Sequence, residues 1–215
     1  MRKEKIVYTH PEKKGSLYVK LTPGYACTNR CAFCVENRKA LERLVGAGPR
    51  LKSAPDAETV LRDLRTEVSP ETKEIVFCGV GEPTLYLDTL LEITHAIKKE
   101  FGVRVRVDTN GQGELIHKCS VVAKKLRKAG VDAVYVSLNA LTPRQYEKVC
   151  RPVFGEKAFW AVLRFIRRCN REGLETKVSF VEGYPGLKIN KTTAIALARV
   201  LGVRKENVLF RKLVS

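Results

Sequence analysis

Hydrophobic residues along this chain alternate between short strand-like runs and longer helix-like patterns from one end to the other. Six runs rich in β-branched and aromatic residues are typical of strands. They cover residues 17–21, 74–78, 103–107, 133–138, 176–181 and 207–211. Between them, apolar residues recur at helical spacing over 56–68, 87–101, 114–129, 156–172 and 190–201. Regular alternation of this kind predicts a parallel sheet with helical crossovers.

The number of repeating units limits the architecture. Six βα units in 215 residues are too few for a closed eight-stranded barrel, which typically needs about 250 residues. No linker-like tract or long internal repeat interrupts the pattern. We therefore predict an α/β fold, an open partial (βα)6 TIM-like barrel with a parallel sheet, formed by residues 1–215 as a single domain.

Polar and glycine-rich segments follow five of the predicted strands. They cover residues 27–34, 79–84, 108–111, 137–139 and 182–186. In parallel α/β sheets, ligands bind where the strands end. Some of these glycines could simply make turns, but five such segments at one rim are hard to explain by packing. The pattern predicts a ligand site there.

Three cysteines in the first of these segments are the most specific chemical signal. Cys27, Cys31 and Cys34 have the spacing C-x3-C-x2-C. Three thiolates on one loop can ligate three irons of a cubane cluster and leave the fourth iron open. Buried cysteines without a metal, or a zinc site completed by a distant ligand, are the alternatives. Three thiols among polar neighbours favour the cluster.

The other strand ends suggest what the site binds. Glu82, between Gly81 and Pro83, is well placed to hold an ammonium group. Alternation along two strands puts polar side chains on one face. These are Arg104, Arg106 and Asp108 in one strand and Tyr135, Ser137 and Asn139 in the next. We favour their pointing inward, although the opposite parity is open. Inward arginines would favour an anionic substrate or serve as partners for buried carboxylates.

The net charge of +17 indicates attraction to a polyanion such as RNA, or to an acidic protein such as a flavodoxin or ferredoxin. One basic stripe, formed by Arg164, Arg167, Arg168 and Arg171, is most simply the solvated outer face of a helix. No apolar run reaches the roughly 20 residues of a membrane helix, and the first residues lead into no signal sequence. Seven cysteines without a paired framework predict a cytoplasmic location.

These motifs resemble the radical SAM superfamily. The cluster motif C-x3-C-x-aromatic-C is matched by Cys27, Cys31, Phe33 and Cys34, and a glycine-rich motif by residues 79–83, with Val80 in place of a glycine. More narrowly, the chain resembles the TatD-linked radical SAM proteins over residues 17 to about 202. That likeness includes residues 77–84, 109–111, 137–140, 150–152 and 183–186.

The resemblance implies one [4Fe–4S] cluster on the three cysteines and S-adenosylmethionine as the second cofactor. It implies that Glu82 binds the methionyl ammonium and Phe33 contacts adenine. Further cofactor contacts are expected from Gly79, Gly81, Asn110, Ser137 and Asn139. Cys150 and Tyr184 are weaker candidates for a catalytic role, and inert packing is the simpler expectation for Cys150. The remaining cysteines stand singly, so no auxiliary cluster is expected.

The resemblance also implies an enzyme that generates a 5′-deoxyadenosyl radical and abstracts hydrogen from a substrate, for which RNA or a nucleotide is our first hypothesis. The alternatives are an activase that installs a glycyl radical on a partner protein, an enzyme for a small acidic metabolite, and a non-enzymatic iron–sulfur or zinc module. An acidic electron donor of the flavodoxin or ferredoxin type and a TatD-type hydrolase are the expected protein partners.

Overall fold

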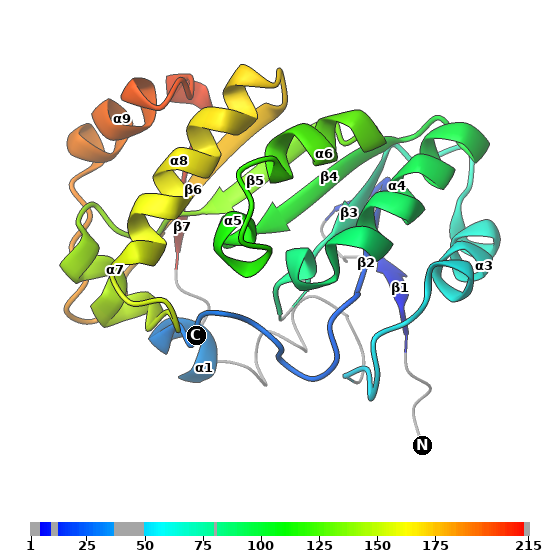
Figure 1. The fold of residues 1–215 in the computed structure, drawn as a ribbon, viewed down its shortest axis with the longest axis horizontal. Helices are drawn as coiled ribbons and strands as arrows, with labels where there is room; N and C mark the ends of the chain where they lie inside the picture. The colour runs from blue at the N-terminus through cyan, green and yellow to red at the C-terminus, as the bar shows by residue number, and fades with distance from the viewer. Residues whose placement is uncertain (1–4, 10–12, 37–49, 80, 213–215) are drawn as a thin grey trace. The chain divides into compact units, whose positions relative to one another are not determined.

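The computed structural model describes residues 5–9, 13–36, 50–79 and 81–212 (Figure 1). The chain divides into two compact units. The first unit comprises residues 1–27, 38–108 and 125–132, and the second comprises residues 28–37, 109–124 and 133–215. Most strands and helices belong to one unit alone.

The first unit contains four strands in chain order. They are β1 (Val7–Thr9), β2 (Ser16–Val19), β3 (Glu74–Phe77) and β4 (Arg104–Thr109). β1 pairs with β2 in the antiparallel sense, and β2, β3 and β4 are parallel, with Leu17 opposite Ile75 and Ile75 opposite Val105. Its helices are α3 (Ala57–Glu67), η1 (Pro83–Tyr86) and α4 (Leu87–Glu100).

The core of the first unit follows the predicted alternation. Val105 and Val107 of β4 are fully buried, whereas Arg104, Arg106 and Asp108 between them are only partly buried. α4 contributes its apolar face, including the fully buried Leu90 and Ile93, to the core. The polar residues of β4 therefore share the face opposite to the valines, as the period of a strand requires.

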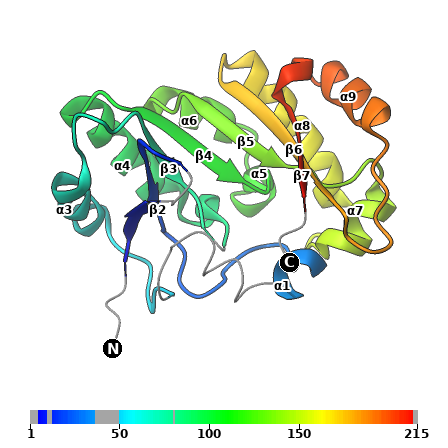
Figure 2. The ribbon, with the colours of Figure 1, turned by 180° about the vertical axis from the view of Figure 1, so that it is seen from behind.

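The second unit contains three parallel strands, β5 (Ala133–Ser137), β6 (Glu175–Glu182) and β7 (Val208–Lys212). Its helices are α1 (Ala32–Glu36), α5 (Gly113–Ile116), α7 (Pro143–Cys150), α8 (Lys157–Arg171), α9 (Lys191–Val200) and η2 (Lys205–Asn207). Figure 2 shows β6 and β7 in front of α8. α6 (Val122–Ala129) gives its first three residues to the second unit and the rest to the first.

Aromatic and aliphatic side chains fill the core of the second unit. α8 buries one side, which includes Phe165 and Ile166, and its other side carries the basic residues. The rings of Phe180 in β6 and Phe210 in β7 stack with centroids 5.8 Å apart. The amphipathic pattern predicted for this helix is therefore confirmed.

The structure corrects three predictions about elements. Residues 114–129 do not form one helix, because Lys118 adopts a left-handed φ of 48° and separates α5 from α6. The sequence pattern missed β1, which has only three residues, and α7. The signal for α7 was present: Thr142 caps the helix by accepting from Gln145 N at 3.2 Å, and Pro143 follows at the first helical position.

The predicted fold class is confirmed. Seven strands are found where six were expected, and all but β1 run parallel to their partners in the two units. Among the described residues, β1 pairs only with β2 and β7 only with β6, so the sheet is not closed. In the same part of the chain, no helix has the length and hydropathy to cross a bilayer.

Candidate functional site

The cysteine segment contributes to both units. Cys27 is the last residue of its part of the first unit, and Cys31 and Cys34 lie in the second. All three are partly exposed and in no disulfide, and Cys34 N donates to Cys31 O at 3.0 Å where α1 begins. Three cysteine thiols are the ligand chemistry of an iron–sulfur cluster. The described residues contain no preformed group of three or more His, Cys, Asp or Glu side chains placed for a metal ion.

The glycine-rich segment of the first unit packs tightly against the chain that leads to Cys27. A Cβ atom at Gly81 would lie 2.2 Å from Thr22 Oγ1 and 3.1 Å from Ala26 O, so only glycine fits. Glu82 N donates to the same Ala26 carbonyl at 2.9 Å. Gly79 has a φ of 144°, another conformation that favours glycine. Val80 lies outside the described residues.

The Glu82 side chain is buried and has a structural role. Its Oε1 accepts hydrogen bonds from Thr84 N at 3.1 Å and from Thr84 Oγ1 at 2.6 Å, which caps η1. Because a carboxylate can accept about four hydrogen bonds, this capping role and a role in ligand binding are chemically compatible. The sequence pattern singled out Glu82 but did not reveal that its side chain caps η1.

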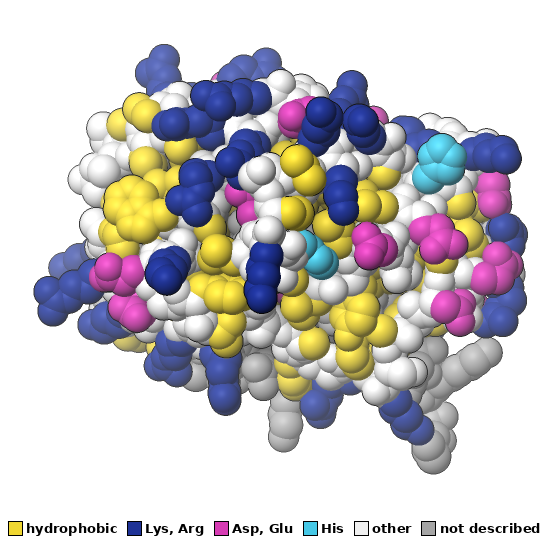
Figure 3. Space-filling model, in the orientation of Figure 1, with side chains coloured by type: hydrophobic (Ala, Val, Ile, Leu, Met, Phe, Trp, Pro, Cys, Tyr) yellow, Lys and Arg dark blue, Asp and Glu magenta, His cyan; other side chains and the backbone are white. Residues whose placement is uncertain are grey.

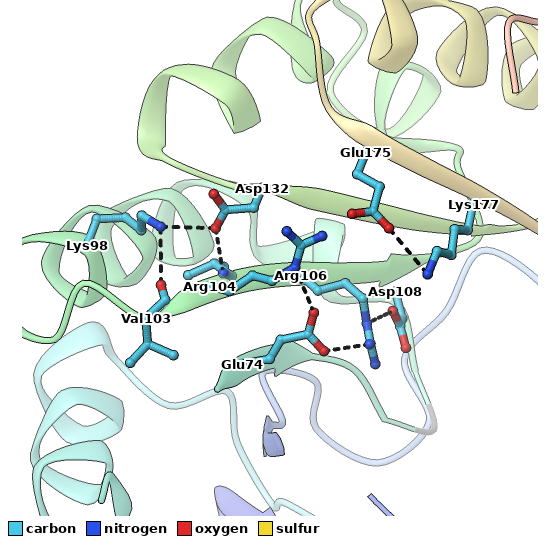
Figure 4. Close-up of polar contacts among 10 residues, drawn as sticks. Glu74, Lys98, Val103, Arg104, Arg106, Asp108, Asp132, Glu175 and Lys177 are labelled. Atoms are coloured by element: carbon cyan, nitrogen blue, oxygen red, sulfur yellow. Dashed lines mark hydrogen bonds and ion pairs between the residues drawn. The ribbon is translucent and has the colours of Figure 1, made fainter. Parts of the chain in front are cut away.

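Ion pairs dominate the polar face of the first unit's strands (Figure 4). Arg106 donates from Nη1 to Glu74 Oε2 at 2.6 Å and from Nε to Asp108 Oδ1 at 2.8 Å. Arg104 Nε also donates to Glu74, at 3.3 Å. The structure thus supports the second of the two alternatives for these arginines, in which they are partners of carboxylates. Nearby, burial raises the pKa of the Cys78 thiol, and the Asp108 carboxylate adds to the effect.

In the second unit, the cysteine segment is tied to the loop after β4. Asn110 Nδ2 donates to Thr28 Oγ1 at 2.9 Å, and Gln112 N donates to Asn110 Oδ1 at 2.9 Å. Between them, Gly111 has a φ of 78°, and a Cβ atom there would lie 2.9 Å from Val136. The motif Thr109-Asn110-Gly111 therefore positions a loop that contacts the cysteine segment directly.

A buried network of neutral polar groups lies beside this loop. Gln112 Nε2 donates to Asn29 Oδ1 at 2.7 Å and to the hydroxyl of Tyr146 at 2.9 Å. Asn29 Nδ2 donates to the same hydroxyl at 3.1 Å. Burial raises the pKa of Tyr146. The sequence pattern did not single out Gln112 or Tyr146, because an amide next to a glycine turn and a tyrosine in an unpredicted helix carry no motif.

Cys150 lies beside the cysteine segment. It is fully buried at the end of α7, and its carbonyl accepts from Arg30 N at 3.0 Å. Three residues later, Val153 N donates to Thr28 O at 2.9 Å. A hydrogen bond with the Cys150 thiol raises the pKa of Cys31 well above its usual value, and burial adds to this. Residues 150–153 and 28–31 thus run side by side in the second unit.

The remaining predicted residues of the second unit lie at the ends of β5 and β6. Ser137 Oγ accepts from Arg211 Nη2 of β7 at 3.2 Å. Asn139 is buried, with a left-handed φ of 58°. The ring of Tyr184 meets that of Phe33 edge-on, with centroids 6.0 Å apart and an interplanar angle of 72°. Phe33, which directly precedes Cys34 in the sequence, therefore has Tyr184 as an aromatic neighbour.

Three buried side-chain oxygens of the second unit have no hydrogen-bond partner in the described part of the chain. They are Gln112 Oε1, Glu114 Oε1 and Asn139 Oδ1. The other carboxylate oxygen of Glu114 forms an ion pair with Arg168. Because buried polar atoms are nearly always paired in folded proteins, such oxygens indicate where a ligand or a water molecule completes the structure.

A sequence comparison decides the family. The model of the Radical SAM superfamily matches residues 21–197, which include the three cysteines, the segment around Glu82, and Asn110 and Asn139. The chain belongs to the radical SAM superfamily. Members of this superfamily use S-adenosylmethionine and a [4Fe–4S] cluster.

Curated relatives of this radical SAM chain include enzymes for RNA and for a nucleotide. The dual-specificity RNA methyltransferase RlmN of Oleidesulfovibrio alaskensis is 25% identical over 173 residues, covering 78% of this chain and 45% of the relative. A probable GTP 3′,8-cyclase of Thermococcus kodakarensis is 30% identical over 166 residues, covering 77% and 44%. The chain thus spans less than half the length of these relatives.

Solved structures agree on the fold. The [FeFe]-hydrogenase maturase HydG of Carboxydothermus hydrogenoformans superposes with a TM-score of 0.61 at 17% identity, covering 91% of this chain and 44% of that one. SuiB of Streptococcus suis, solved with bound S-adenosylmethionine, gives a TM-score of 0.59 at 16% identity, covering 91% and 38%. At these identities the likeness supports the fold alone.

Proposed function

We propose that this chain is a radical SAM enzyme that acts on RNA or a nucleotide. In this proposal Cys27, Cys31 and Cys34 would hold one [4Fe–4S] cluster. The cluster would supply the electron for reductive cleavage of S-adenosylmethionine to methionine and a 5′-deoxyadenosyl radical, which would abstract hydrogen from the substrate. The observation that carries the proposal is the family match over residues 21–197 together with three cysteines at C-x3-C-x2-C spacing, none of them in a disulfide.

The chain's own residues bind and orient the ligands. Glu82, buried and held by Thr84, supplies a carboxylate for the methionyl ammonium in surroundings where the attraction is little screened. Gly79 and Gly81 let the backbone approach the cofactor closely, and Phe33, with Tyr184 at its edge, is proposed to contact adenine.

Amides in the second unit complete the proposed cofactor and substrate contacts. Asn139 Oδ1 and Gln112 Oε1 are buried acceptors without a donor in the described residues, and ribose hydroxyls or base amino groups provide such donors. Ser137 and Asn110 remain proposed contacts for ribose or carboxylate groups. Cys150 is proposed as a neighbour that shapes the position of Cys31, in place of a direct role in catalysis.

The substrate class rests on charge and on relatives. The net charge of +17 favours a polyanion, and the named relatives are an RNA methyltransferase and GTP cyclases. An acidic flavodoxin or ferredoxin is the proposed electron donor, and the TatD-type hydrolase stays a proposed partner. Seven cysteines, none of them in a disulfide, support a cytoplasmic location.

The decisive experiment is anaerobic reconstitution with iron and sulfide, followed by measurement of 5′-deoxyadenosine after addition of dithionite and S-adenosylmethionine, with and without cellular RNA. We expect product from the wild type, none from Cys31→Ala, and stimulation by RNA. Cys169→Ala is the matched control, because Cys169 is buried in α8 within the core. Persistent turnover in Cys31→Ala, or a protein that binds only zinc, would refute the proposal.

A further inference from the structure

The outer face of α8 carries a row of cationic side chains with one aromatic ring among them. We define the α8 row as Lys157, Trp160, Arg164, Arg167 and Arg171. Successive members are three or four residues apart, so they lie on one side of the helix. All five are exposed, and the indole of Trp160 is 52% exposed. Figure 3 shows dark blue side chains gathered over α8.

The arginines of this row form no ion pair in the described part of the chain, although Glu156 and Glu172 flank the two ends of α8. α8 contains no acidic residue between Lys157 and Arg171, and no carboxylate of the described residues pairs with Arg164, Arg167 or Arg171. α3 of the first unit differs, because its Arg65 pairs with Glu58 at 3.0 Å and with Glu100 at 2.9 Å. A merely solvated helix face usually mixes both signs of charge. The α8 row therefore has uncompensated positive charge for a partner to neutralise.

Trp160 distinguishes this row from a simple charge stripe. It is a large apolar side chain left exposed on a helix that buries its other aromatic residues, Phe159 and Phe165. The ring of Phe159 meets the indole edge-on, with centroids 5.5 Å apart. Exposed aromatic rings between basic side chains are the elements with which proteins bind single-stranded nucleic acid, by stacking on bases and neutralising phosphates.

The row begins next to the cysteine segment. α8 follows residues 150–153, and these are hydrogen-bonded to residues 28–30. From Trp160 to Arg171 the helix rises by about 16 Å, a length that several nucleotides cover. A strand lying along α8 would therefore start at the end of the helix that follows residues 150–153 and reach Arg171, within the second unit alone.

We propose that the α8 row binds single-stranded RNA, with Trp160 stacking on a base and Arg164, Arg167 and Arg171 contacting phosphates. This inference rests on the proposed function and assigns it a binding surface. An acidic electron-donor protein would also neutralise the positive charge. It would not explain why an exposed indole lies within a single line of basic side chains.

The test measures binding of a short fluorescein-labelled, mixed-sequence single-stranded RNA to reconstituted protein by fluorescence anisotropy at several salt concentrations. Trp160→Ala should weaken binding about tenfold or more, and Trp160→Phe should retain most of it. The triple variant Arg164→Gln, Arg167→Gln, Arg171→Gln should lower the slope of log K against log salt by about 2. The matched control, Arg199→Gln, Arg204→Gln, Lys205→Gln, removes the same charge from exposed positions on and after α9.

Equal losses in the two triple variants would overturn the proposal, because net charge alone would then explain binding. So would an α8 triple variant that loses affinity for an acidic flavodoxin while keeping its affinity for RNA. Formation of 5′-deoxyadenosine without RNA should be unchanged in every α8 variant. If the wild-type protein formed no 5′-deoxyadenosine, the proposed function would be refuted. The RNA-binding data would still test the role of the α8 row.

Discussion

The two units of the chain bury polar side chains in different ways. In the first unit, the guanidinium of Arg106 lies between the carboxylates of Glu74 and Asp108, so these three charges compensate one another. In the second unit, Asn29, Gln112 and Tyr146 form a network of neutral groups, and the oxygens without partners among the described residues all belong to this unit.

This difference distinguishes polar groups that stabilise the fold from polar groups that can bind a ligand. A charge already neutralised by two partners offers little to an anionic substrate, since binding would have to break existing ion pairs. An amide oxygen that is buried without a donor gains a hydrogen bond when a ligand provides one. We therefore expect the first unit's strand face to govern stability, and the amides of the second unit to govern binding.

The largest expected effect comes from breaking the ion pairs of the first unit. Arg106→Met should lower the free energy of unfolding by about 3 kcal/mol, because Asp108 would lose its cation and Glu74 would keep only Arg104, in a partly buried setting. Urea unfolding of the purified protein measures the loss. Adding Asp108→Asn to this variant should restore part of it, since one uncompensated charge is then removed. No recovery in the double variant would argue against an electrostatic cause.

Breaking the neutral network of the second unit should have a smaller effect on stability. Gln112→Ala should cost about 1–3 kcal/mol, because the Asn29 carbonyl would lose the Gln112 donor and the Tyr146 hydroxyl would keep only Asn29 Nδ2 of its two donors. It should also lower the iron retained per chain after reconstitution, since Asn29 lies two residues before Cys31. Gln145→Ala is the control: Gln145 Oε1 accepts only from Leu141 N near the start of α7. Equal iron content in the two variants would contradict a positioning role for Gln112.

The same contrast explains what the sequence could predict. Strand ranges were correct to within two residues, because alternation such as that of Val105 and Val107 reflects burial on one face. Cysteine spacing and the glycine motifs carried the chemistry, since those residue types at that spacing serve few other purposes. Gln112 and Tyr146 could not be predicted, because they meet Asn29 only through tertiary contacts across 83 and 117 residues of chain. The pairing of Arg106 with Glu74 of β3 depended on strand register, which no local pattern reveals.

Alkaline pH should lower the free energy of unfolding through groups in both units. Burial raises the pKa of Tyr8 and Cys78 in the first unit, and of Tyr146 and Cys169 in the second. The unfolded chain would release these protons above about pH 8.5 for thiols and about pH 10 for tyrosines, so the free energy of unfolding should fall as the pH rises beyond those values. Urea unfolding at a series of pH values measures the slope. Tyr8→Phe should make the slope above pH 10 less steep, and an unchanged slope would show that Tyr8 ionises without unfolding.

The substitutions with the smallest expected effect on stability test whether the two units unfold together. The chain passes between them after residues 27, 37, 108, 124 and 132, and α6 belongs to both, so we expect one cooperative transition. Ile93→Val removes a buried methyl group from the first unit at a cost of about 1 kcal/mol, and Asn190→Ala removes the cap of α9 in the second unit at a similar cost. Trp160, the single tryptophan, reports on the second unit by fluorescence, while circular dichroism reports on both. Ile93→Val should shift the fluorescence and circular dichroism transitions to the same lower urea concentration. A fluorescence transition at the wild-type urea concentration would mean that the first unit unfolds on its own. Its ion pairs would then stabilise only the strands that carry them.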